Sequence, residues 1–172
     1  MYWKVDRAIF LYHCRQLETK TNLQIFQYKV IHRVFQCNHW LYNCKVINSP
    51  CCTFCNKDDN IIYYFTECGV MPAFWFSFGN WWNRIMNCDI DLNIYNFILG
   101  YNENLSNNAN LNYCVILAKY YIWKMKKQSN NIEFYSYLVY LKSKLAIKHL
   151  YHSINCSLEI FNLKWNEIYE NI

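Results

Sequence analysis

Cysteine is the residue type in this chain with the clearest capacity for chemistry. Six of the ten cysteines lie within one short segment, namely Cys37, Cys44, Cys51, Cys52, Cys55 and Cys68. Within that segment, Cys52-x2-Cys55-x7-Tyr63-x4-Cys68 has the spacing of a zinc knuckle, with tyrosine where the third ligand is normally histidine. Two cysteines separated by two residues can direct both thiolates to one ion from a tight turn. The spacing therefore gives three candidate zinc ligands.

The fourth ligand is left open by this spacing. A phenol with an ordinary pKa near ~10 is a poor zinc donor at neutral pH, so Tyr63 needs help from the metal's own charge. Cys51 could replace Cys52, whereas Cys44 or His39 would have to fold back from the preceding segment. Two alternatives remain. Either a three-cysteine site is completed by water or a neighbouring group, or the thiols hold no metal.

The N-terminus and the other cysteines bear on the cellular compartment. Residues 8–12 are apolar, but they follow Asp6 and Arg7 and precede no small-residue cleavage site, which is unlike a signal peptide. Every apolar run is shorter than the ~18 residues of a spanning helix. We therefore expect an intracellular protein, cytoplasmic or nuclear and not membrane-bound, whose clustered cysteines serve a metal rather than disulfides. Small buried hydrophobic residues are expected at Cys14, Cys88, Cys114 and Cys156.

The sequence lacks the patterns of a catalytic centre. A polymerase needs metal-binding aspartates on a hydrophobic hairpin, whereas the one Asp pair, Asp58 and Asp59, lies among polar residues of the cysteine loop. There is no Gly-rich phosphate loop, nucleophile elbow or His-Glu-x-x-His motif. His32 and His39 have no carboxylate at a spacing typical of a catalytic pair. We therefore expect a protein that is not an enzyme.

Basic residues form a second candidate site. The net charge is +5, and between residues 111 and 152 seven lysines accompany a single acid, Glu133. Basic faces of helices bind phosphate groups with little sequence preference and with an affinity that falls steeply with salt. The candidate nucleic-acid-binding residues are Lys29, His32, Arg33, Lys119, Lys124, Lys144 and Lys148. The alternative is that these residues lie on ordinary solvated helix faces.

Helices are the elements expected to position these residues. With 3 Gly and 2 Pro the chain has too few turn residues for a many-stranded β fold, and its aromatic content of 20% indicates a packed core. We expect a mostly α-helical bundle with an inserted zinc-knuckle-like loop at residues 49–60. Apolar spacing predicts helices over residues 23–36, 111–127, 132–152 and 157–169, a short helix beginning at Asn38, and a helix after Pro72 whose apolar stripe includes Phe74, Trp75, Phe78, Trp82 and Ile85. Residues 61–65 are a short apolar stretch.

Several motifs, taken in order, resemble a known family. They are FQYKVIHRV at 26–34, NHWLY at 38–42, SPCCTFC at 49–55, IIYYFTEC at 61–68, the pair Phe74 and Trp75, and LAKYYIWK at 117–124. Their order resembles the reverse-transcriptase zinc-binding domain, which lies downstream of the polymerase in LINE-type non-LTR retrotransposons. The resemblance covers residues 23–165. It implies zinc ligands at Cys52, Cys55 and Cys68, with a histidine expected at position 63.

The resemblance also implies a domain organisation and a role. Residues 1–22 are an N-terminal extension, 23–100 a reverse-transcriptase zinc-binding-like domain, 101–110 an Asn-rich connection and 111–172 a C-terminal helical region. The implied role is a non-catalytic domain that holds RNA or DNA for a reverse transcriptase. Two alternatives stay open: a helical structural or protein-interaction module, and a non-functional relic of a retroelement.

Overall fold

The computed structural model describes residues 21–101 and 108–172, and within these ranges the chain is mostly helical, as the composition predicts. The helices are α2 (Thr21–Ile31), α3 (Asn38–Asn43), α4 (Ile61–Thr66), α5 (Met71–Met86), α6 (Ile94–Leu99), α7 (Asn108–Lys127), α8 (Phe134–Ile154) and α9 (Leu158–Glu170). Most of the predicted N-terminal extension, Cys14 and the middle of the Asn-rich connection lie outside the described residues. None of the helices in the described ranges has both the length and the apolar character needed to cross a membrane.

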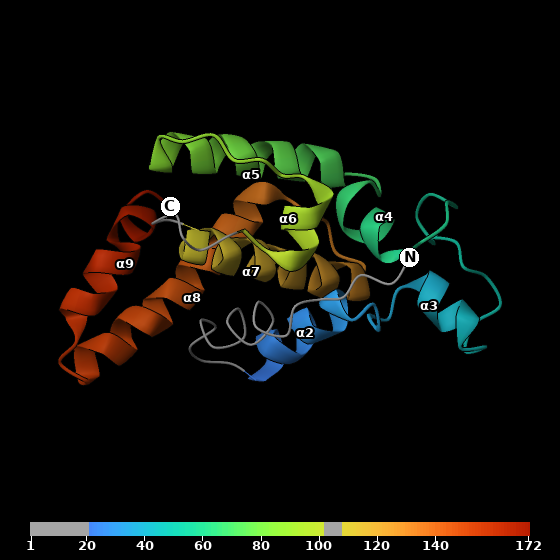
Figure 1. The fold of residues 1–172 in the computed structure, drawn as a ribbon, viewed down its shortest axis with the longest axis horizontal. Coiled ribbons are helices and arrows are strands. Elements are labelled where there is room, and N and C mark those ends of the chain that lie inside the picture. Colours follow the sequence, from blue (N-terminus) through green and yellow to red (C-terminus); the bar gives the residue numbers. More distant parts are fainter. Residues whose placement is uncertain (1–20, 102–107) are drawn as a thin grey trace.

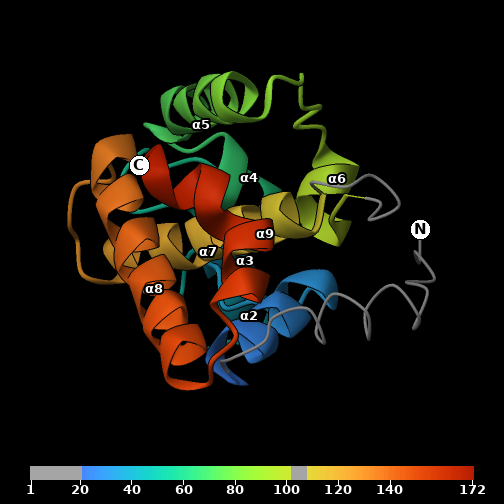
Figure 2. The same ribbon diagram turned by 90° about the vertical axis from the view of Figure 1, so that its left-hand side faces the viewer.

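Helix α7 forms the centre of the molecule. Figures 1 and 2 show it between α5 on one side and α2 on the other, with α8 and α9 side by side at one end. Eleven of its 20 residues are buried, from Leu111 to Ile122. A helix that is buried around most of its circumference is the natural hub of a small bundle. The residues on either side of the predicted connection therefore share one hydrophobic core.

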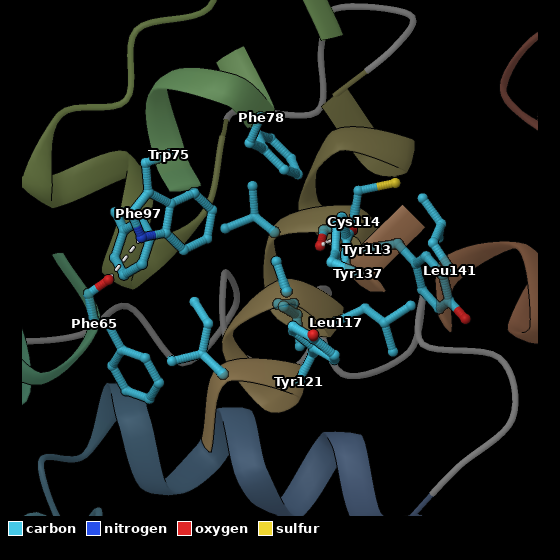
Figure 3. Packing of buried hydrophobic residues seen from close by; sticks show 14 of the residues in the cluster. Phe65, Trp75, Phe78, Phe97, Tyr113, Cys114, Leu117, Tyr121, Tyr137 and Leu141 are labelled. Carbon is cyan, nitrogen blue, oxygen red and sulfur yellow. Dashed lines mark hydrogen bonds between the residues drawn. The ribbon is translucent and has the colours of Figure 1, made fainter. Parts of the chain in front are cut away.

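Aromatic side chains fill most of this core (Figure 3). The rings of Trp75 and Phe97 meet edge to face with their centroids 4.7 Å apart, and the indole Nε1 of Trp75 donates a hydrogen bond of 2.6 Å to the Phe65 carbonyl. The buried Tyr137 hydroxyl likewise donates to the Cys114 carbonyl at 2.9 Å. Large rings with satisfied polar atoms contribute much buried area at little polar cost. These contacts join α4, α5 and α6 to one another and α8 to α7.

The long helices agree with the sequence-based expectations. Pro72 lies in the first turn of α5, and the buried residues of that helix include Phe74, Trp75, Phe78 and Trp82 of the predicted stripe. The predicted helices 111–127, 132–152 and 157–169 correspond to α7, α8 and α9. The predicted short helix begins at Asn38 as α3.

Two local expectations are wrong, and the apolar stretch 61–65, for which the sequence predicted no element, has a defined structure. The first helix ends at Ile31 rather than at residue 36, because the backbone turns at Arg33, whose φ is +57°. The stretch 61–65 forms the short helix α4, which the Asn60 side chain caps. Cys88 and Cys156 are exposed rather than buried, since each follows the end of a helix; Cys114 is buried as expected.

Candidate metal centre

A tight loop presents the first two cysteines of the cluster. The Cys52 amide donates to the Lys57 carbonyl at 2.8 Å, and the Asn56 amide donates back to the Cys52 carbonyl at 2.9 Å. Asn56 takes a left-handed conformation with φ +57°, which asparagine tolerates better than most residues. An isolated antiparallel bridge between Cys51 and Asp58 closes the base of the loop. The turn thus holds Cys52 and Cys55 in a compact loop, residues 51–58, which we call the knuckle.

The third cysteine comes from the end of α4. Asn60 begins this helix by accepting hydrogen bonds from the amides of Ile62 at 3.1 Å and Tyr63 at 3.0 Å. Just past the C-terminus of the helix, the Cys68 amide donates to the Tyr63 carbonyl at 3.0 Å, which turns the chain toward the loop. Helix α4 therefore fixes both Tyr63 and Cys68 relative to the knuckle.

The thiols of Cys52, Cys55 and Cys68 converge on one point. Their sulfur atoms all lie within 4.8 Å of one another, with Cys52 Sγ 3.4 Å from Cys68 Sγ and Cys55 Sγ 3.8 Å from Cys68 Sγ. Thiolates around tetrahedral zinc, with Zn–S near 2.3 Å, are separated by about 3.8 Å. Among the described residues this is the group of potential ligands close enough to hold a metal ion. The three predicted ligands are therefore brought together.

The side chain of Tyr63 lies beside the thiol cluster. Its hydroxyl lies 2.7 Å from Cys55 Sγ, and the residue is buried. This hydrogen bond lowers the pKa of the Cys55 thiol to about 7 and raises the pKa of the Tyr63 phenol, because the phenol donates to the thiolate. Burial raises the pKa of the Cys68 thiol to about 12. Of these two thiols, Cys55 is therefore the one that loses its proton more readily.

The other proposed ligands lie outside this group. Neither His39, Cys44 nor Cys51 belongs to the set of donors that converge. The ring of His39 instead pairs through Nδ1 with the Asp58 carboxylate at 2.7 Å, and Cys44 is exposed. The donor set available to a metal is therefore three thiols and one phenol. Three sulfur donors suit zinc, whose position would lie among Cys52, Cys55 and Cys68.

The predicted basic residues are distributed over more than one surface. His32 and Arg33 are exposed and Lys29 is half-buried at the end of α2. Lys124 of α7 and Lys144 of α8 meet at one ring, since their Nζ atoms lie 5.9 and 4.9 Å from the centroid of Tyr140. These five residues keep side chains that can reach a phosphate.

The predicted phosphate-binding roles of Lys119 and Lys148 are wrong. Lys119 is 1% exposed and its Nζ donates to Gln27 Oε1 at 3.0 Å and to the Phe97 carbonyl at 2.9 Å. Lys148 is buried with its Nζ 3.9 Å from the ring centroid of Tyr113. Both amines point into the bundle, because α7 is enclosed by other helices and the side of α8 that carries Lys148 faces α7. Neither can contact a polyanion at the surface.

Sequence reasoning missed three residues that lie around the cysteine cluster. Lys126 donates to the Tyr64 carbonyl at 2.7 Å and lies over that ring, and Lys127 stands over the ring of Trp123. Asp59, assigned to a polar loop, is buried. The signal that could have located the lysines is their position in the last turn of the predicted helix 111–127.

Comparisons of the chain with protein-family models, with curated proteins and with solved structures find no match.

Proposed function

We propose that this chain is a non-catalytic nucleic-acid-binding accessory domain of a retroelement reverse transcriptase, stabilised by one zinc ion at Cys52, Cys55 and Cys68. The observation that carries the proposal is the convergence of these three thiols within 4.8 Å, although they come from two separate elements, a loop and the end of a helix. The motif order that resembles the reverse-transcriptase zinc-binding domain supplies the class of protein.

The role of zinc in this proposal is to fix two parts of the chain. Cys52 and Cys55 belong to the knuckle, and Cys68 follows α4, which packs on the core through Phe65. Structural zinc sites contribute folding free energy by linking such segments. The ion would hold the knuckle against the helical bundle and so order the surface beside it.

The nucleic-acid part of the proposal rests on charge at the end of α7. Lys124 and Lys127 are exposed in the last turn, and Lys126 lies between them beside the knuckle. Such a cluster attracts phosphates and releases counterions when they bind. With Lys119 and Lys148 removed from the set, these residues together with Arg33 and Lys144 are the proposed phosphate contacts.

A salt series tests this function. Binding of labelled RNA and single-stranded DNA to the zinc-loaded protein is measured by fluorescence anisotropy at increasing salt. For the five proposed phosphate contacts, the logarithm of the binding constant of a single strand should fall with the logarithm of salt with a slope of about −3.5. The double change Lys124→Gln and Lys127→Gln removes two of these contacts and should make the slope less steep by about 1.4. Lys142→Gln, on an exposed lysine of α8, is the matched control and should leave it unchanged.

Absence of binding even at low salt would overturn the nucleic-acid function and favour the second candidate, a protein-interaction module. One observation favours that candidate. Helix α8 carries Val139, Ile147, Leu150 and Ile154 on its outer side, each more than half exposed, at helical spacing. A stripe of exposed aliphatic residues is more typical of a protein contact than of a nucleic-acid contact.

A further inference from the structure

A small pocket lies directly beside the thiol cluster. It has a volume of about 270 Å³ and is bounded by the knuckle, α3, the start of α4 and the last turn of α7. The residues that matter here are Phe54, Asp59, Tyr64, Trp123, Lys126 and Lys127. Residues that carry three aromatic rings, two amines and one carboxylate thus line one space. Such a set is suited to a flat ligand that carries both hydrogen-bond donors and negative charge.

The carboxylate of Asp59 is the least expected member of this set. Asp59 is 3% exposed, and its Oδ2 accepts a hydrogen bond of 3.1 Å from the Asn38 amide. Its Oδ1 is buried and accepts no hydrogen bond from the described part of the chain. The amine of Lys126 donates to the Tyr64 carbonyl instead. A buried carboxylate oxygen without a donor is costly, so it indicates a donor that arrives with a ligand.

The aromatic residues and lysines describe the remainder of that ligand. Phe54 at the tip of the knuckle is 64% exposed. Exposure of a large apolar side chain to water is unfavourable, so a partner that covers it would be stabilising. Trp123 is half-buried, and Lys127 Nζ lies 5.5 Å from its ring centroid. Exposed aromatic rings next to lysines are the usual means of stacking an unpaired base while neutralising its phosphate. The base edge would then face the carboxylate.

Asp59 Oδ1 is a hydrogen-bond acceptor, so it selects bases that can donate a hydrogen bond. Cytosine, adenine and guanine carry an exocyclic amino group that can donate to a carboxylate. Thymine and uracil have only a ring N–H, which lies between two carbonyl oxygens that a carboxylate repels. The carboxylate therefore favours a base that carries an amino group over thymine or uracil.

We propose that this pocket, which we term the base pocket, binds one unpaired nucleobase bearing an exocyclic amino group. The amino group donates to Asp59 Oδ1, Phe54 and Trp123 contact the faces of the base, and Lys126 and Lys127 lie at the flanking phosphates. This inference rests on the proposed nucleic-acid function and adds a specificity to it.

The test compares short oligonucleotides of equal length at low salt by fluorescence anisotropy. The zinc-loaded wild-type protein should bind oligo-dC about tenfold more tightly than oligo-dT, since one base-edge contact discriminates by about that factor. Asp59→Asn keeps an acceptor for the Asn38 amide but presents an N–H₂ group to the pocket. That variant should reverse the order, because its new donor matches the carbonyl oxygens of thymine.

Two controls keep the test decisive. Asp58→Asn changes the neighbouring exposed carboxylate, which pairs with His39 outside the base pocket, and should leave the dC preference unchanged. An oligonucleotide in which 2-pyrimidinone replaces cytosine lacks only the amino group and tests the wild-type protein itself. It should bind about as weakly as oligo-dT, whether or not Asp59→Asn folds.

Equal binding of oligo-dC, oligo-dT and the pyrimidinone oligonucleotide would overturn the base pocket and leave the proposed function intact, provided that affinity still falls with salt. No binding of any oligonucleotide at low salt would overturn the proposed function and the base pocket with it. Phe54→Ala adds an independent check, since loss of one stacking partner should weaken binding of oligo-dC about tenfold.

Discussion

At the scale of single residues, Tyr63 decides how completely a metal can be enclosed. Its hydroxyl lies 2.7 Å from Cys55 Sγ, beside the cluster of three thiols. A neutral phenol is a weak zinc ligand at pH 7, whereas a neutral imidazole can bind zinc through a ring nitrogen without losing a proton. Zinc held by three thiolates alone remains open to water or chelators, unlike the closed four-ligand sites of structural zinc.

The first prediction follows from this weak donor. Tyr63→His should increase zinc affinity by about tenfold or more, since it supplies the fourth donor of a closed site. Affinity is measured by competition with a chromogenic chelator, with Cys52→Ser as the variant that loses a thiolate. Tyr63→Phe keeps the ring and removes the hydroxyl, so it should leave the affinity close to that of the wild type. A loss with Tyr63→Phe as large as that with Cys52→Ser would show that the phenol is already a ligand.

Lys119 leads to a prediction about pH. Burial lowers the pKa of its amine to about 7 from an ordinary value of 10.5, and its amine donates to uncharged partners on Gln27 and Phe97. Between these two pH values the unfolded chain binds a proton that the folded chain does not. Stability from this residue therefore rises with pH across that window, by at most about 1.4 kcal/mol per pH unit.

The measurement compares wild type with Lys119→Met. The unfolding free energy of the wild type minus that of Lys119→Met should increase steadily from about pH 7 to about pH 9.5, as determined by urea denaturation. Taking the difference removes the titration of cysteines and tyrosines, which both proteins share. Lys142→Met, at an exposed lysine, serves as the control and should show no such trend. Parallel pH profiles for wild type and Lys119→Met would contradict the prediction.

The outcome for lysines shows where sequence reasoning reaches its limit at this scale. Cysteine spacing located Cys52, Cys55 and Cys68 because metal ligands must be close in space and these are also close in sequence. The spacing of lysines does not show which of them face solvent when the helix has apolar residues on all sides. Lys119 lies in a helix segment buried from Leu111 onward, so only the three-dimensional packing assigns its amine to the interior.

At the scale of elements, short helices depend on their caps more than long ones do. Helix α4 has six residues, and Asn60 accepts hydrogen bonds from two of its amides. Helix α6, also of six residues, has the corresponding cap at Asn93, which accepts from one amide. The two caps differ in what they support, since α4 carries Tyr63 and leads into Cys68 whereas α6 carries no ligand.

This difference gives an element-scale prediction with a matched control. Asn60→Ala and Asn93→Ala should each lower the free energy of unfolding by about 1 kcal/mol, the usual cost of an N-cap. Only Asn60→Ala should also weaken zinc binding, because it loosens the helix that orients Cys68. Urea denaturation and chelator competition provide the two readouts. Equal zinc affinity for both variants would mean that the knuckle alone positions the metal.

Short elements are also where the sequence predicted least, with α3 as the exception. Helical periodicity over many residues predicted α5, α7, α8 and α9 because a long apolar stripe averages out single exceptions. Helix α6 has too few residues to show a period, and it exists because Asn93 caps it and Phe97 packs on Trp75. The early end of α2 depends on a left-handed Arg33, which no local pattern of residues announces.

At the scale of the whole molecule, one core unites the segments on either side of the Asn-rich connection. Phe26 of α2 lies 5.3 Å from Tyr120 of α7, measured between ring centroids, and Phe74 of α5 lies 5.7 Å from Tyr137 of α8. Helix α7 thus covers the apolar face of α2, and α8 packs on that of α5, around the central α7 (Figure 1). The knuckle joins the same body through Lys126, whose amine bonds to the Tyr64 carbonyl.

Removal of α7 together with the helices that follow it should therefore unfold the remainder of the chain. A chain ending at Tyr101 would expose the rings of Phe26, Phe74 and Trp75, so it should lack a cooperative thermal transition by circular dichroism even with zinc present. The matched control ends at Ser157 and removes α9, which packs mainly on α8; it should keep a cooperative transition at a lower temperature, because α7 and its partners remain. A cooperative transition and dispersed amide resonances from the shorter chain would mean instead that the cysteine-bearing half folds independently, with zinc supplying the stability that α7 supplies here.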